Sequence, residues 1–231
     1  MNVFQLKQFA STSVHAATGA VRWNYDKVEM IADGIVHAVG VSFGLVAATV
    51  LVVLTAIYAS AIDIVVVSIY VAGLLSMLVL SATYNLWPVS PTKWVLRRFD
   101  HSAIYMLIAA TYTPLIMQMK HNIFALVLLT AVWCIAILGI VLKLRWPGRF
   151  DRLAVGLYLA LGWSVIMIYD SVATALPPFA IGFVIAGGIL YSLGVIFHAW
   201  RRLRFQNAIW HGFVLLGAGC HYTAVLDLVL A

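Results

Sequence analysis

The chain has 231 residues, of which 64% are hydrophobic and 10% are charged, and its mean hydropathy is +1.03. A soluble domain carries roughly 25% charged residues, so this composition excludes a soluble globular protein and predicts a polytopic membrane protein. The formal net charge of +6 comes from basic residues in short loops between apolar stretches, where it indicates membrane topology and not nucleic-acid binding.

Seven apolar runs follow one another along the chain, and each is close to the ~20 residues that a helix needs to cross a bilayer. They cover residues 32–58, 63–86, 101–119, 123–143, 153–172, 178–199 and 208–230. The breaks between them are short and carry charged or turn-forming residues. We therefore predict an all-α, seven-transmembrane helix bundle, with residues 1–28 as a cytoplasmic N-terminal tail and residues 29–231 as one domain.

Basic residues predict the orientation of this bundle, because cytoplasmic loops are enriched in Lys and Arg. The tail and the loops after the second, fourth and sixth runs carry nearly all of them: Lys7, Arg22, Lys27, Lys93, Arg97, Arg98, Lys143, Arg145, Arg149, Arg152, Arg201, Arg202 and Arg204. The opposite loops carry only Lys120. We expect a cytoplasmic N-terminus and a C-terminus outside.

Polar and ionisable residues gather at the predicted cytoplasmic ends of four runs. They are Glu29, Asp33 and His37 near the first run, Ser81 and Asn85 in the second, Asp100 and His101 in the third, and Asn207 and His211 at the seventh. Residues four apart share one face of a helix and can present two ligands to one ion. Ionisable groups in a membrane helix are costly, so this set predicts a functional site.

The segments that carry these residues resemble the hemolysin III family, the bacterial branch of the progestin and adipoQ receptor superfamily. The matching segments are EMIADGIVHAVG (29–40), SATYN (81–85), FDHSAIYMLIAATYTP (99–114) and NAIWHGFVLLGAGCHYTAV (207–225). The resemblance implies the same seven spans with the N-terminus inside. It also implies a zinc ion near the cytoplasmic face, held by one His from span two and two from span seven, with an Asp of span three acting through water.

This chain departs from that pattern at the metal ligands. The resemblance places the three ligands on Asn85, Asn207 and His211, so two of the three are carboxamides, whereas Asp100 is retained. The family's usual Asn in the first helix falls on Asp33. Neutral Asn is a poor ligand for Zn²⁺, which prefers imidazole, thiolate and carboxylate. We expect a degenerate site with no tightly bound zinc or other cofactor.

The resemblance leaves several functions open. We expect a role in membrane-lipid homeostasis or sensing, with membrane lipids as partners, in the bacterial inner membrane. If the chain is an enzyme, it is a metal-dependent lipid amide hydrolase resembling the ceramide-type enzymes, with Asp100 as general base and Ser81 assisting. Its altered ligand set would combine His211 with Asp100, Asp33, His37 or His101. A buried hydrogen-bond network without metal, or the cell lysis that the family name suggests, are further alternatives.

Three expectations concern residues outside this set. We expect His198, at the interface end of the sixth span, to be solvated or to snorkel to the interface rather than to bind a metal. We expect His221, about 15 Å deeper than His211 by helix rise, to be a hydrogen-bonded core residue. The glycines of the sixth span, which are Gly182, Gly187, Gly188 and Gly194, are compatible with close helix packing.

Overall fold

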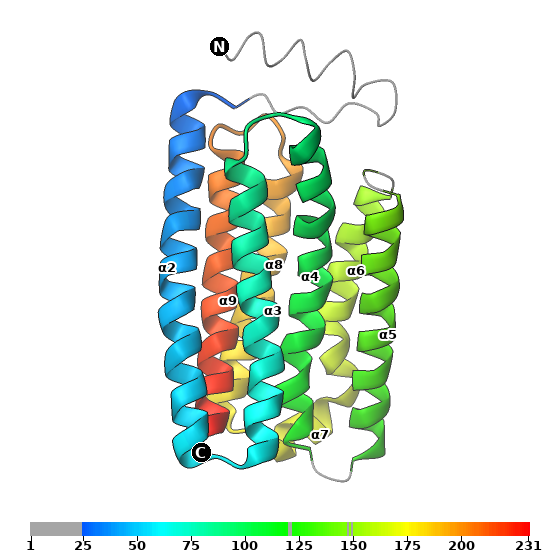
Figure 1. Cartoon of the computed structure of the whole chain (residues 1–231). Helices are drawn as coiled ribbons and strands as arrows, with labels where there is room; N and C mark the ends of the chain where they lie inside the picture. The colour runs from blue at the N-terminus through cyan, green and yellow to red at the C-terminus, as the bar shows by residue number, and fades with distance from the viewer. Residues whose placement is uncertain (1–24, 120–121, 147, 149) are drawn as a thin grey trace.

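Helices make up every regular element of the computed structural model, which describes residues 25–119, 122–146, 148 and 150–231. The main helices are α2 (Lys27–Tyr58), α3 (Ala61–Leu86), α4 (Pro91–Met117), α5 (Ile123–Arg145), α6 (Asp151–Trp163), α7 (Tyr169–Ala175), α8 (Pro178–Ala199) and α9 (Gln206–Leu230), as Figure 1 shows. The predicted all-α bundle is confirmed. Most of the predicted tail, residues 1–24, lies outside the described residues.

Short polar side chains fix where the first three helices begin. Asp26 and Glu29 form a capping box at the start of α2, and Ser60 and Asp63 form another at the start of α3. Ser90 caps α4, with Pro91 in its first turn. Because of this cap, α4 begins ten residues before the apolar run at 101–119.

Six of the helical stretches are long and apolar enough to cross a membrane: Lys27–Tyr58, Ala61–Leu86, Ile123–Arg145, Leu153–Ala175, Pro178–Ala199 and Gln206–Leu230. The helix α4 has 27 residues but carries four charged residues in its first half, and its second half is almost wholly buried. It packs against α3, α5, α6 and α9, so protein and not lipid surrounds it. A helix shielded in this way tolerates polar residues that a lipid-facing helix excludes.

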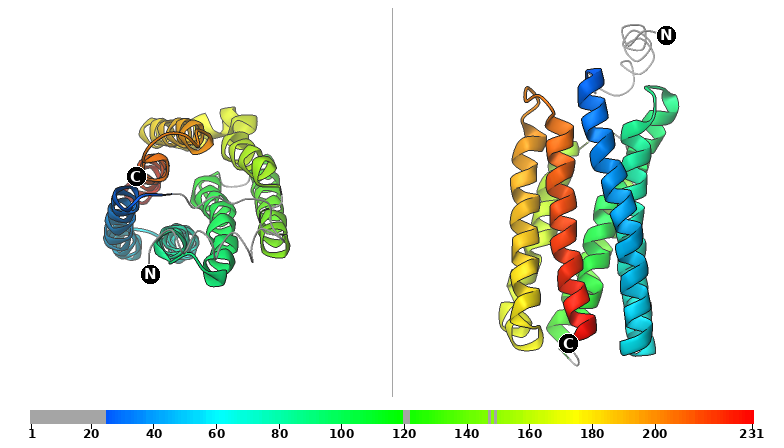
Figure 2. Two further views of the ribbon diagram at one scale, coloured as in Figure 1. Left: turned by 90° about the horizontal axis from the view of Figure 1, so that it is seen from above. Right: turned by 90° about the vertical axis from the view of Figure 1, so that its left-hand side faces the viewer.

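The helices follow one another around the bundle, and α9 closes it against α2 (Figure 2, left). One apolar core joins α4 to α5, α6 and α7, around Tyr105, Val132 and Leu161. A second joins α4 to α2, α3 and α9, around Leu51, Tyr70 and Val225. Since α4 contributes to both cores, it fixes the two halves of the bundle relative to each other.

The fifth predicted span is interrupted between α6 and α7 by a 3₁₀ turn at Ser164–Ile168. The Tyr112 hydroxyl of α4 enters this break. It lies 2.8 Å from the carbonyl of Leu161, to which it donates, and accepts a hydrogen bond of 2.8 Å from the Val165 N–H. Backbone groups at membrane depth must be satisfied inside the protein, and a distant side chain does so here. The apolar run at 153–172 carried no sign of the break.

Candidate functional site

A cavity of about 1870 Å³ lies inside the bundle. We call the end of the bundle where α2, α4 and α9 begin, at the top of Figure 1, the polar end. The polar residues that line the cavity near this end include Glu29, Asp33, Ser81, Asn85, Asp100, His101, His198, Asn207 and His211. The apolar residues of the deeper wall include Leu107, Ile108, Leu115, Val172, Leu176, Ile181 and Val184. All nine predicted polar residues except His37 line this cavity.

Asp33, His37 and His211 form the tightest group at the polar end. His211 Nδ1 lies 2.6 Å from Asp33 Oδ1, and His37 Nε2 lies 3.7 Å from the same oxygen. The two imidazole rings are 4.4 Å apart between centroids. His37 itself does not line the cavity. It lies behind Asp33 and His211, which do line it, and contacts both.

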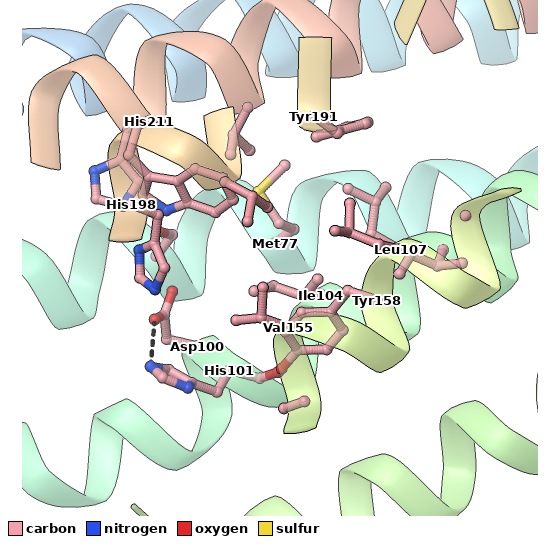
Figure 3. Close-up of a pocket in the computed structure, with 18 of the residues that line it drawn as sticks. Met77, Asp100, His101, Ile104, Leu107, Val155, Tyr158, Tyr191, His198 and His211 are labelled. Atoms are coloured by element: carbon pink, nitrogen blue, oxygen red, sulfur yellow. Dashed lines mark hydrogen bonds and ion pairs between the residues drawn. The ribbon is translucent and has the colours of Figure 1, made fainter. Parts of the chain in front are cut away.

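Asp100 lies on α4 next to His101, whose Nε2 is 3.9 Å from the Asp100 carboxylate (dashed line in Figure 3). Its side chain is only 14% exposed and lines the same end of the cavity as Ser81. The backbone carbonyl of His101 accepts a hydrogen bond of 2.9 Å from Tyr158 of α6. Asp100 and Ser81 thus line the same end of the cavity, and α6 is hydrogen-bonded to the middle of α4 at His101.

His198 points into the same cavity from α8 (Figure 3), so the expectation of a solvated side chain is wrong. Its Nδ1 is buried without a hydrogen-bond partner among the described residues, and its ring packs 4.9 Å from that of Trp210. The position of His198 at the helix end suggested a side chain in contact with solvent, but Trp210 of α9 packs against its ring. His221 hydrogen-bonds the Val184 carbonyl at 3.2 Å, in agreement with the expected core role.

The two carboxamides that the resemblance places at ligand positions are engaged in hydrogen bonds. Asn85 Nδ2 donates to the carbonyl and the hydroxyl of Ser81, at 3.0 and 3.3 Å. Asn207 Oδ1 accepts from the hydroxyl of Tyr25 at 3.1 Å. Burial raises the pKa of Tyr25 to about 12, so this phenol remains a neutral donor at physiological pH. Each amide satisfies a neighbouring polar group inside the bundle.

Glu29, a member of the predicted cluster, has a structural role because its carboxylate accepts two backbone hydrogen bonds. One carboxylate oxygen accepts from the Asp26 N–H at 2.9 Å in the capping box of α2. The other accepts from the Phe205 N–H at 3.0 Å, where Phe205 has a left-handed backbone (φ 58°) before α9. This carboxylate therefore joins the start of α2 to the start of α9, the two helices that supply Asp33 and His211.

A second charged group at the polar end was not recognised in the sequence. Asp151, at the start of α6, pairs with Arg97 of α4 at 2.5 Å and with Lys143 of α5 at 2.6 Å. Burial opposes ionisation, but the Arg97 guanidinium and the Lys143 ammonium hold the pKa of Asp151 at about 2. The only signal was a lone acid in a basic loop, and no pattern along the chain indicated its partners.

Comparison with known proteins identifies one matching family and several relatives. The family model described as "Haemolysin-III related" matches residues 27–222. The "Hemolysin-3 homolog" of Bacillus subtilis (strain 168) is 37% identical over 198 residues, covering 86% of this chain and 93% of the relative. The "Hemolysin-3" of Bacillus cereus is 32% identical over 202 residues, covering 87% and 92%. The "Monocyte to macrophage differentiation factor" of Homo sapiens is 28% identical over 165 residues, covering 68% and 67%.

Proposed function

The chain belongs to the haemolysin-III-related family, and we propose that it binds the acyl part of a membrane lipid in its cavity and acts in membrane-lipid homeostasis or sensing. It is a multi-pass bacterial membrane protein. The residues at its family zinc position, which are Asn85, Asn207 and His211, take part in hydrogen bonds and do not together hold a metal ion. The polar end would receive the head of the lipid, and the apolar wall would receive its chain.

The observation that carries this proposal is the composition of the cavity wall. Ligand pockets commonly hold about 300–1,000 Å³, so a cavity of about 1870 Å³ has room for a lipid-sized molecule. Its charged residues are gathered at one end, whereas Leu115, Val172 and Ile181 line the deeper part together with a few neutral polar side chains such as Thr111. An amphiphile with one polar head and one long apolar chain matches this division.

The family position does not fit a zinc ion in this chain. Two of its three residues offer neutral amides, which are weak ligands for Zn²⁺. The Asn85 amide nitrogen is turned to Ser81, and the Asn207 oxygen already accepts from Tyr25. Only His211 remains as an imidazole, and its Nδ1 is paired with Asp33. The contacts of Asn207 and His211 support a network that joins α9 to α2 and to Tyr25 before it, whereas Asn85 bonds within α3.

The competing function is a metal-dependent lipid amide hydrolase, which requires Asp100 and Ser81 to act on a carbonyl. In detergent micelles containing a ceramide, we expect the unaltered protein and Asp100→Ala to release equal, background amounts of fatty acid. Release that depends on Asp100 would replace the proposed role with hydrolysis. The lysis that the name of the Bacillus cereus relative implies would instead appear as dye leakage from vesicles carrying the purified protein.

The lipid-binding proposal is tested by filling the cavity. Ile108 lines the deep wall, whereas Ile137 lies on α5 and is 54% exposed. We would label each protein in vesicles with a photoactivatable, diazirine-bearing phospholipid and map the modified peptides. We expect labelling of α4 and α8 at cavity positions to fall more than about twofold in Ile108→Trp, because the added ring occupies the chain's space.

The matched variant Ile137→Trp adds the same ring on the outer surface and should leave the cavity labelling unchanged. Equal labelling in all three proteins, or labelling confined to outward-facing positions, would show that lipid contacts only the outside of the bundle and would refute the proposal.

A further inference from the structure

We propose that Asp33, His37 and His211 form a binding site for a divalent transition-metal ion of the zinc type. One ligand atom from each of the three side chains lies within 4.8 Å of the other two. The site uses α2 and α9, and it shares only His211 with the family ligand positions, since Asp33 and His37 take the place of Asn85 and Asn207. It does not depend on a lipid in the cavity.

The burial of His37 is the observation that points to a ligand. The residue is 7% exposed, and its Nε2 has no hydrogen-bond partner among the described residues. A buried polar atom without a partner costs about 1–3 kcal/mol, and such atoms are rare in folded proteins. This nitrogen lies on the side of the ring nearest to Asp33 and is 3.7 Å from its carboxylate. An ion between the two groups would satisfy it.

The donor set suits zinc. Two imidazoles and one carboxylate are ligands that Zn²⁺ accepts, and three protein ligands leave its fourth tetrahedral position open. Asp33 and His211 line the cavity, so this fourth position faces space from which an ion and a water molecule can enter. Asp33 is 7% exposed, and a divalent ion would balance the charge of a carboxylate held inside the bundle.

Ion binding requires a small rearrangement of these side chains. Ligand atoms about 2.0–2.1 Å from zinc lie roughly 3.3 Å apart in a tetrahedron. The His211 Nδ1 to Asp33 Oδ1 distance of 2.6 Å must therefore lengthen, and the His37 Nε2 to Asp33 Oδ1 distance of 3.7 Å must shorten slightly. The proton between His211 and Asp33 leaves to solvent as the ion enters. Both movements are within the reach of side-chain rotation.

The test measures zinc alone on the full chain in detergent. The protein is stripped with EDTA, dialysed against Zn²⁺, and analysed by inductively coupled plasma mass spectrometry and by competition with a chromophoric chelator. We expect about one zinc per chain. Asp33→Asn and His37→Gln, which keep the size and polarity of the side chains, should each weaken zinc binding at least about tenfold.

Two control variants separate this site from others. His221→Gln removes an imidazole ten residues further along α9, and Asn85→Ala removes a residue of the family position. Both should keep the zinc of the unaltered protein. Elution volume and thermal midpoint without zinc identify any variant that has not folded. Substoichiometric zinc in the unaltered protein, full zinc in both Asp33→Asn and His37→Gln, or loss of zinc in folded Asn85→Ala would each overturn the proposal.

Discussion

Single side chains decide which ions and hydrogen bonds the polar end can support. Asn85 and Asn207, which the family resemblance places at ligand positions, form hydrogen bonds with Ser81 and Tyr25. Asp33 adds a carboxylate 2.6 Å from His211. The sequence singled out Asn85, Asn207, Asp33 and His211 as site residues, but it did not show that His37 lies beside His211 and that Glu29 serves as a helix cap.

Restoring the two imidazoles tests whether the bundle keeps the geometry of the family. In an Asp33→Asn background, which removes the carboxylate beside His211, we expect the further changes Asn85→His and Asn207→His to raise bound zinc to about one per chain. Three imidazoles then surround one position, as in His₃ zinc sites. Metal analysis compares this triple variant with Asp33→Asn alone, and equal zinc in the two would mean that positions 85, 207 and 211 do not converge.

At the scale of elements, two features determine how the helices lie around the cavity. They are the close contacts at glycines of α8 and the break in the fifth span. Gly187 packs against His221, Gly188 against Trp163, and Gly194 against Phe213, so three of the four glycines in the sixth span lie at close contacts. Gly182 faces open space. Composition alone could not separate these cases, because the difference depends on which faces of α8 meet α6 and α9.

The substitution Gly187→Ala tests the close approach of α8 to α9. An added Cβ would overlap the His221 ring and lie 3.1 Å from the Gly217 carbonyl, which is backbone and cannot move aside. We expect a loss of about 1–3 kcal/mol, measured as a lower thermal midpoint in detergent. Gly182→Ala is the matched control and should be neutral or slightly stabilising, since nothing lies within 4 Å of its Cβ. An equal loss in both variants would point to helix flexibility and not to packing.

At the scale of the whole molecule, α4 is the central element, and charged pairs at the polar end join it to its neighbours. Arg97 and Lys143 bind Asp151 and so connect α4, α5 and α6. The basic residues that indicate topology in the sequence therefore also hold the bundle together. This double role could not be inferred from the alternation of charge along the chain.

The Asp151 pairs predict an acid-dependent part of the stability. Because its folded pKa of about 2 is below the unfolded value of about 3.9, this contribution is fully present above about pH 4 and is lost as the pH falls toward 2. Thermal midpoints measured in an acid-stable detergent should fall less over this range in Asp151→Asn than in the unaltered protein. Asp170→Asn, at an exposed position, should retain the unaltered pH profile; identical profiles for all three proteins would contradict the prediction.

The orientation of the bundle is a prediction from charge that cell-based reporters can check. The end of α5 and the C-terminus lie at opposite ends of the bundle (Figure 1). With the N-terminus inside, alkaline phosphatase fused after Ala231 should be active, and the same reporter fused after Trp146 should be inactive. The reverse pattern would place the polar end outside the cell.

The sequence by itself determined the membrane class, the helical spans and the polar residues at their ends, because hydropathy and short-range periodicity are properties of local segments. It located most span limits within a few residues, but it missed the polar first turns of α4, where a cap extends the helix beyond the apolar run. Only the tertiary structure decided which helix lies inside the bundle, where the fifth span breaks against Tyr112, and which polar atoms meet. Those outcomes depend on contacts between residues far apart in the chain, such as Asp33 with His211, and local pattern carries no information about such distances.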